Sequence, residues 1–411
     1  MSKNQMLRSD SRRTFLKFSV AAAAASAFRI VNEPMLAAAA VDRDFQHFPP
    51  GSVVINANEN PLGPCDLARK ALSDIIPEGG RYCWWLKEEL TKSFAESVAV
   101  KPENVAIFPG SSEPLHFSVM AFTSPTRSYV TADPGYESGM HSSKYSGARV
   151  VKTALTKSCA HDIPAMLAAA PDAGLFYVCT PNNPTGTLTP HAAIEELLAK
   201  KPKGSVVLVD EAYIHFADLN ATAIDLVKAG QDIIVLRTFS KIYGMAGIRC
   251  GAAIARPDLL EKLTPQSGGS AMPITALVAA SASLRHEHLV PERKLINTTI
   301  REKTFDWLKS HGYSFTPSQA NFFMLDGKRP AKQVIDAMAA QKVFIGRIWP
   351  VWPTHLRITV GTQPEMDAFQ TAFAAVMKNS TSVSYALPAS SGDSRRDYFY
   401  ADGTRFPRIS S

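Results

Sequence analysis

The sequence predicts an α/β fold, with a large domain built on a mostly parallel sheet and a small α+β domain after it. First, short apolar runs alternate with helical stretches from about residue 64 to residue 326, the pattern of strands covered on both faces by helices. Second, a shorter unit with its own strands and helices ends the pattern. Third, 411 residues are too many for one simple core.

The strands of the large domain are predicted from short apolar runs. These runs are Val105–Phe108, Tyr129–Ala132, Leu175–Cys179, Val206–Val209, Ile233–Leu236 and Gly251–Ala255. Helical stretches such as Pro114–Phe122 and His191–Ala199 lie between them. Parallel strands need connections of this length, and a helix usually supplies them.

A long helical stretch near Glu292–His311 leads into the small domain. The elements that follow are strand Phe322–Leu325, helix Ala331–Ala340, strand Leu356–Val360 and helix Pro364–Met377. We therefore expect a large domain of residues 64–290 and a small domain of residues 291–378. Residues 379–411 are rich in serine, arginine and aspartate and lack a helical period, which predicts a flexible tail.

The N-terminus predicts an export signal. Two adjacent arginines, Arg12 and Arg13, precede a mild apolar run, and Ala37–Ala40 offers the small residues that a signal peptidase needs. Residues 1–40 resemble a twin-arginine (Tat) signal peptide, which implies a periplasmic or exported protein and the Tat machinery as a partner. An alanine-rich helical arm is the alternative.

The charge and cysteine content exclude some classes of partner. Residues 1–40 contribute +4 of the net charge of +7, so the remaining chain stands near +3 and gives little reason to expect nucleic acid. Beyond the signal, no stretch is apolar for long enough to span a membrane. The five cysteines contain no Cys-x-x-Cys pair, and we expect no metal site.

Three polar clusters follow three of the predicted strands: Asn182–Gly186, Asp210–Tyr213 and Thr238–Lys241. Their spacing suits one helical crossover between each pair of parallel strands. Because ligands bind outside the carboxyl ends of such strands, the clusters should converge on one crevice. Taken singly, the clusters also read as a turn, a helix cap and a solvated surface.

These motifs resemble those of fold-type I aminotransferases of class I/II, which depend on pyridoxal 5′-phosphate (PLP), and within them the histidinol-phosphate aminotransferase-like branch. The matching elements lie within residues 52–378 and are Asn56–Pro64, Pro181–Gly186, Val209–Tyr213, Ser240–Gly251 and Leu356–Thr359. The resemblance implies a seven-stranded sheet, a small domain completed by an N-terminal arm of residues 41–63, and PLP as the cofactor.

The resemblance also assigns the catalytic residues. Lys241 would carry PLP as a Schiff base and, once freed by the amino substrate, move the substrate α-proton. Asp210 would pair with the pyridinium nitrogen and keep the ring an electron acceptor. Asn183 and Tyr213 resemble the pair that hydrogen-bonds the phenolic oxygen of the cofactor.

The cofactor phosphate is expected at Ser111 and Ser112, which open a helix after a predicted strand, because free N–H groups at a helix start bind anions. Ser240 and Arg249 match phosphate contacts of the family. Tyr136 matches the ring that stacks on the pyridine, with a core tyrosine as the alternative. Tyr82 matches a tyrosine that reaches the neighbouring subunit's phosphate, which implies a homodimer with shared active sites, although Cys-Trp-Trp follows it where the family usually has proline.

Substrate contacts are expected mainly in the small domain. Arg357 matches the arginine that grips a substrate carboxylate, and Asn58 in the arm is a further candidate. Arg347 resembles a second arginine for a distal anion, or it meets an internal carboxylate. The segment between the arginines is shorter than usual and carries Trp349 and Trp352, which either wall the side-chain pocket or pack between the domains.

Three functions remain open at this point. The first is transamination between an L-amino acid, or a histidinol-phosphate-like amine, and a 2-oxo acid. The second is other PLP chemistry on the same scaffold, such as decarboxylation of amino-acid phosphates, racemisation or elimination. The third is a non-enzymatic cofactor-binding module, which predicts a damaged lysine or aspartate. The altered substrate loop and the export signal both argue against histidinol phosphate.

Overall fold

The computed structural model describes residues 48–269 and 271–378. The predicted signal peptide of residues 1–40 and the predicted tail of residues 379–411 lie outside the described residues. The chain divides after Ser52, and every element below belongs to the part that begins at Val53. Within the described ranges, no helix is long and apolar enough to cross a membrane.

A seven-stranded sheet forms the centre of the large domain, with the strand order β2-β8-β7-β6-β5-β3-β4. The strands are β2 (Val105–Phe108), β3 (Ser128–Ala132), β4 (Val150–Thr153), β5 (Ala173–Cys179), β6 (Val206–Asp210), β7 (Ile233–Thr238) and β8 (Gly251–Ala255). Strand β8 alone runs opposite to the other six strands of this sheet. The prediction of a mostly parallel seven-stranded sheet is confirmed, and β4 is an edge strand that we did not predict.

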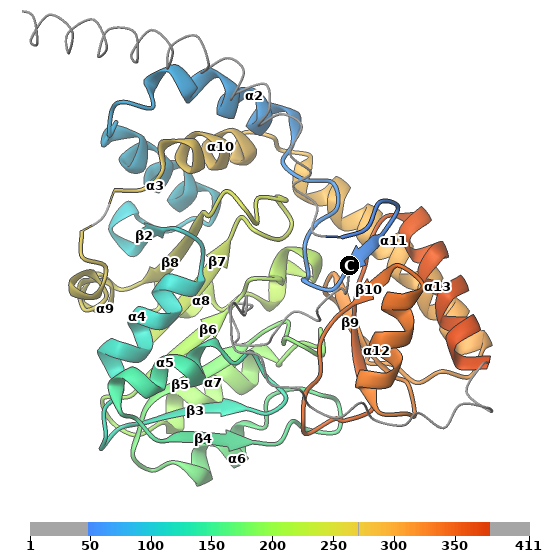
Figure 1. Ribbon diagram of the computed structural model, residues 1–411. Helices are drawn as coiled ribbons and strands as arrows, with labels where there is room; N and C mark the ends of the chain where they lie inside the picture. The colour runs from blue at the N-terminus through green and yellow to red at the C-terminus, as the bar shows by residue number, and fades with distance from the viewer. Residues whose placement is uncertain (1–47, 270, 379–411) are drawn as a thin grey trace, which may run out of the picture. The chain divides into compact units, whose positions relative to one another are not determined.

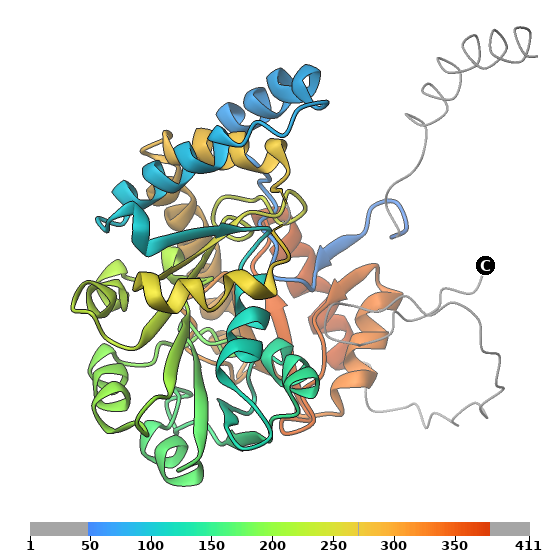
Figure 2. The same ribbon diagram turned by 90° about the vertical axis from the view of Figure 1, so that its left-hand side faces the viewer.

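Both faces of this sheet are covered, because successive residues of a strand point to opposite sides. Val207 and Val209 of β6 enter one hydrophobic core, and Leu208 enters the core on the other face. The helices of the large domain are α2 (Asp66–Ile75), α3 (Trp85–Ser97), α4 (Ser112–Phe122), α5 (Ser138–Ser146), α6 (Ile163–Ala169), α7 (His191–Lys200), α8 (Ile224–Lys228), α9 (Pro257–Glu261) and α10 (Ile274–Leu284). Helix α10 packs along α2 and α3 (Figures 1 and 2). Short 3₁₀ turns complete the large domain: η1 (Ile76–Glu78), η2 (Pro102–Asn104), η3 (Ile214–Phe216), η4 (Leu219–Ala221) and η5 (Thr264–Gln266).

The small domain contains two short sheets packed on helices. Its elements are α11 (Leu289–Ser310), β9 (Phe322–Asp326), α12 (Ala331–Ala340), β10 (Val343–Ile345), β11 (His355–Thr359) and α13 (Gln363–Lys378). Strands β9 and β11 pair antiparallel, and α11 lies beside α13 (Figure 1). Strand β1 (Val53–Ile55) pairs in parallel with β10. Strand β1 lies in the arm and was not predicted, because three residues are too few to show alternation.

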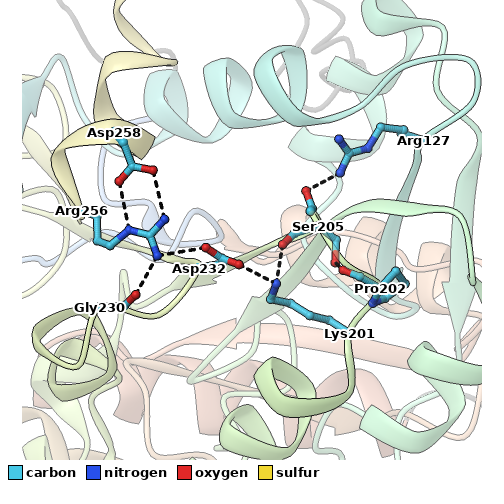
Figure 3. Close-up of polar contacts among 9 residues, drawn as sticks. Arg127, Lys201, Pro202, Ser205, Gly230, Asp232, Arg256 and Asp258 are labelled. Carbon is cyan, nitrogen blue, oxygen red and sulfur yellow. Dashed lines mark hydrogen bonds and ion pairs between the residues drawn. The ribbon is translucent and has the colours of Figure 1, made fainter.

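A polar network joins the ends of three strands on the edge of the large sheet opposite to the polar clusters (Figure 3). Asp232, just before β7, accepts a 2.9 Å hydrogen bond from Lys201 Nζ and pairs with Arg256 at 3.0 Å. Lys201 also donates to the carbonyl of Ser205, which precedes β6. Burial alone would raise the pKa of Asp232, but Lys201 and Arg256 outweigh it and lower that pKa. This network holds the amino ends of β6 and β7 and the carboxyl end of β8 together.

Candidate active site

The three polar clusters follow β5, β6 and β7, which are adjacent strands of the sheet. Cys179 at the end of β5 pairs with Asp210 at the end of β6, and Asp210 pairs with Leu236 of β7. Their carboxyl ends therefore meet at one edge. The convergence expected from the sequence is what the fold produces.

Asp210 is buried and held by two donors. Tyr177 Oη donates a 2.9 Å hydrogen bond to Asp210 Oδ2, and the Ala212 N–H donates at 3.1 Å to Oδ1. Burial raises the pKa of Asp210 to about 6, although both hydrogen bonds and the charge of Lys241 oppose that rise. Tyr177 was missed at the sequence level; a tyrosine inside a buried apolar strand needs a partner for its hydroxyl, and that is the signal that could have found it.

Lys241 follows β7 and lies beside Tyr213. Its Nζ is 5.5 Å from the centre of the Tyr213 ring. Burial, and then the positive charge of Arg357, lower the pKa of Lys241 to about 8. A substantial fraction of this amine is therefore neutral near pH 8, which an attack on an aldehyde requires.

Tyr213 and Asn58 connect the arm to the sheet. Asn58 Nδ2 donates to Tyr213 Oη at 3.2 Å, and the Asn58 N–H donates to Thr359 Oγ1 at 2.9 Å. Asn58 is 1% exposed, and its φ of 55° is left-handed, a conformation that asparagine tolerates better than most residues. Asn183 Oδ1 accepts a 2.9 Å hydrogen bond from Arg357 Nη1. The structure thus brings Asn58 against Tyr213 and Asn183 against Arg357, and the charge of Arg357 acts on the Tyr213 hydroxyl.

A cationic cradle lies where β2 leads into α4. Arg249 donates to Ser240 Oγ at 3.2 Å and to the carbonyl of Pro109 at 3.3 Å, so its guanidinium lies across this loop. Gly110 is required there, since its φ is +87° and a Cβ would lie 2.2 Å from Arg249 Nη2. Ser111 and Ser112 come next and begin α4. A positive group beside a helix start suits a phosphate.

Tyr136 lies just after β3 and adjoins several of these residues. Burial raises its pKa, a hydrogen bond with Ser112 lowers it, and the charges of Asp210 and Arg347 also act on it. Tyr136 is therefore near the cradle, the Asp210 carboxylate and the small-domain arginines.

The two small-domain arginines differ in their partners. Arg357 is 6% exposed and donates only to the neutral acceptors Asn183 Oδ1 and the Asn56 carbonyl, the latter at 2.8 Å. Among the described residues, no carboxylate pairs with it. Arg347 forms an ion pair with Glu137. The sequence left open whether Arg347 meets an internal carboxylate; it does, although nothing in the sequence singled out Glu137.

Tyr82 and Trp352 stand apart from this group. The side chain of Tyr82 is 69% exposed, and its ring stacks on Trp84 with the centroids 5.0 Å apart. Trp352 packs against His355. Trp349, by contrast, is 1% exposed and lies between the arginines, 4.4 Å from Arg347 and 5.3 Å from Arg357.

The residues that converge here fit PLP. The Arg249 cradle suits its phosphate, and a Cβ on Gly110 would close that cradle. The buried Asp210 suits the protonated ring nitrogen, because a positive charge would offset the cost of burying the carboxylate. Lys241, with its lowered pKa, suits the aldehyde.

Comparisons with known proteins agree with this fit. The family model for aminotransferase class I and II matches residues 52–373. The histidinol-phosphate aminotransferase of Moorella thermoacetica is 33% identical over 337 residues, which cover 79% of this chain and 85% of the relative. The aromatic amino acid aminotransferase of Rhodococcus jostii is 34% identical over 330 residues, or 78% and 89% of the two chains.

The fold is also similar to that of solved aminotransferase structures. The crystal structure of histidinol-phosphate aminotransferase from Sinorhizobium meliloti in complex with PLP superposes with a TM-score of 0.73 at 24% identity, covering 80% of this chain and 91% of the other. The α/β architecture with its mostly parallel sheet is thus fold type I. With the family model covering most of its length, the chain belongs to the class I and II aminotransferases and is a PLP-dependent aminotransferase.

Proposed function

We propose that this aminotransferase acts on α-amino acids, with Arg357 holding the α-carboxylate of the substrate. The observation that carries the proposal is that Arg357 is buried while its described partners are neutral. Burial, and then the charge of Arg347, lower the pKa of Arg357 to about 10, although Tyr213 and the charge of Glu137 oppose that fall. A bound carboxylate would supply the missing negative charge through a forked pair of hydrogen bonds.

The proposed roles follow from position. Ser111, Ser112, Ser240 and Arg249 hold the phosphate of PLP, Asp210 its ring nitrogen, and Asn183 and Tyr213 its phenolic oxygen. When bound, PLP supplies an electron sink for negative charge at the substrate α-carbon. Lys241 takes the α-proton and returns it, because its lowered pKa lets the amine exchange a proton near pH 8. Tyr136 covers the ring, and Asn58 keeps Tyr213 in place.

A donor panel tests the substrate proposal. The purified enzyme is mixed with L-amino acids and either 2-oxoglutarate or pyruvate, and the amino and oxo products are both measured. Matched amounts of the two products support transamination. Carbon dioxide, inverted amino acid or ammonia in their place would instead support the alternative PLP chemistries. Arg357→Ala should weaken the binding of every α-amino acid but not the binding of a substrate without an α-carboxylate, such as histidinol phosphate.

The assembly proposed here is a homodimer with shared sites, in which Tyr82 contacts the phosphate held by the neighbouring subunit. The exposed apolar side chains in the stretch of residues 62–85 support this proposal, because large apolar groups left in solvent are typical of surfaces that bind another protein chain. They are Leu62, Leu67, Ile76, Tyr82, Trp84 and Trp85.

The proposed location is the periplasm or the cell exterior, reached through a Tat-type signal in residues 1–40. The paired Arg12 and Arg13 and the alanines that follow support it. PLP is held at several points by residues far apart in the sequence, so loading it before export requires a folded chain. The Tat route accepts folded proteins.

A further inference from the structure

The ion pair between Glu137 and Arg347 sets the two arginines of the site apart. The side chains of Glu137 and Arg347 are 25% and 15% exposed, respectively, so water screens this ion pair only partly. Arg357, by contrast, has only neutral acceptors among the described residues. Among the described residues, Arg357 thus has no carboxylate partner, whereas Arg347 is paired with the carboxylate of Glu137.

Trp349 keeps these arginines in place. Its ring lies 4.4 Å from the Arg347 guanidinium and 5.3 Å from that of Arg357, within the range of cation–π attraction. Trp349 Nε1 donates to the carbonyl of Gly135 at 3.2 Å, two residues before Glu137. The β3–α5 loop is therefore joined to the small domain at both Gly135 and Glu137.

Charge then decides which side chains can approach Arg347. A substrate with a second anion has to displace the Glu137 carboxylate from a largely desolvated contact, and the displaced carboxylate would stay nearby and repel the anion. An uncharged side chain leaves the pair intact and can lie against Trp349 and the stems of the arginines, which are apolar surfaces.

We propose that Glu137 is a specificity-determining residue that neutralises Arg347, so that the site selects amino acids with one carboxylate and an uncharged side chain over those with a distal anion. This inference rests on the proposed role of Arg357. It adds that Arg347, which resembles the arginine used for a distal anion in the family, is already paired with a carboxylate of the same chain.

Glu137→Gln tests this proposal, because glutamine keeps the shape and removes the charge. Single-turnover half-reactions are followed by absorbance with phenylalanine and with glutamate. The glutamate-to-phenylalanine ratio of kcat/KM should rise at least about tenfold, the gain for one new charge-assisted hydrogen bond. Adding Arg347→Met to Glu137→Gln should cancel the gain.

Asp133→Asn is the matched control. Asp133 lies in the same loop and pairs with Lys152 at 3.0 Å, and not with either arginine of the site. The variant removes the same charge, and its ratio should stay at the native value. An unchanged ratio in Glu137→Gln, an equal loss for both substrates, or an equal rise in the control would each overturn the proposal.

A binding measurement separates this inference from the proposed function. The PLP-loaded enzyme is titrated with glutarate and with 3-phenylpropionate, two unreactive carboxylates, by thermal shift. Glu137→Gln should tighten glutarate at least about tenfold relative to 3-phenylpropionate. If the native enzyme transaminated no amino acid, the proposed function would fail, yet this ratio would still decide the role of Glu137. A ratio equal to that of the native enzyme would reject it.

Discussion

Burial moves the pKa values of Lys241 and Asp210 toward each other. It lowers the pKa of Lys241 to about 8 and raises that of Asp210 to about 6. Both groups can therefore change protonation near neutral pH, which is typical of groups that carry out proton transfer or bind a charged cofactor. An exposed lysine would stay charged up to its ordinary pKa of 10.5.

The Lys241 pKa predicts how PLP attachment depends on pH. Only the neutral amine attacks an aldehyde, so attachment to the cofactor-free protein should rise with pH and level off above about 8. Borohydride reduction and mass spectrometry should locate the adduct on Lys241. Arg357→Ala removes a positive neighbour and should shift this profile to higher pH. An adduct on another lysine would refute the assignment.

Asp210→Asn should lower turnover by about 10²-fold or more, the loss typical when a charge that stabilises a transition state is removed. PLP binding should weaken much less, because the phosphate contacts remain. Tyr177→Phe should lower turnover to a smaller degree, since it removes a hydrogen bond that holds down the pKa of Asp210. Tyr129→Phe removes a neighbouring buried hydroxyl that makes no hydrogen bond to Asp210, and it serves as the control. Near-normal turnover in Asp210→Asn would contradict the proposed role.

At the scale of elements, a buried ion pair joins β6 to β7 beside the site. Arg237 Nε donates to Glu211 Oε2 at 2.7 Å, and the two side chains are 5% and 0% exposed. Thr222 donates to Glu211 and accepts from Arg237 Nη2 at 2.9 Å, so the network is well supplied with partners. Glu211 adjoins Asp210, and Arg237 lies four residues before Lys241. The pair therefore holds together the strand ends from which these two groups project.

Arg237→Met should cost about 3–5 kcal/mol of unfolding free energy, because it leaves the Glu211 carboxylate buried without its cation. Urea denaturation of the PLP-loaded enzyme measures this. Asp258→Asn breaks an ion pair with Arg256 at the opposite edge of the sheet, where the carboxylate is 57% exposed, and should cost about 1 kcal/mol or less. Equal losses of unfolding free energy in the two variants would show that the buried ion pair stabilises the fold no more than the exposed one.

At the scale of the whole molecule, the shared-site proposal predicts complementation between two defective subunits. Lys241→Ala keeps Tyr82, and Tyr82→Ala keeps Lys241, so a mixed dimer would contain one site with both residues. Mixing the unfolded variants and refolding them with limiting PLP should restore activity that neither shows alone. Tyr145→Ala, which removes a 78% exposed tyrosine elsewhere, should retain activity by itself. No recovery on mixing would argue that each site is made by one chain.

The export proposal predicts that replacing Arg12 and Arg13 together by lysine leaves active enzyme in the cytoplasm. Lysine keeps the charge but lacks the planar guanidinium. Replacing Arg8 and Arg29 together by lysine changes the same number of arginines outside the pair and should still allow export. Cell fractionation with an activity assay distinguishes the two. Export of the cofactor-free, unfolded chain would count against the Tat route.

The sequence by itself determined the elements whose pattern is local. Strands β2 and β8 and helix α12 have the predicted bounds. A strand covered on both faces needs a continuous apolar run, and a helix with one buried face needs apolar residues at a regular period, so both patterns are visible in the sequence. The polar clusters containing Asn183, Asp210 and Lys241 were recognisable together, because their spacing suits helical crossovers between parallel strands and ligands bind outside the carboxyl ends of such strands.

Only the tertiary structure decided the contacts between distant segments. Strand β1 pairs with β10, and Val53 lies opposite Val343 although the two are 343 − 53 = 290 residues apart. Tyr177 reaches Asp210 from a neighbouring strand, and Glu137 of the large domain meets Arg347 of the small one. Such contacts depend on which segments the fold brings together, and no local spacing encodes them. The shifted pKa values of Lys241 and Asp210 have the same origin, because desolvation is a property of the surrounding fold and not of the residue that is buried.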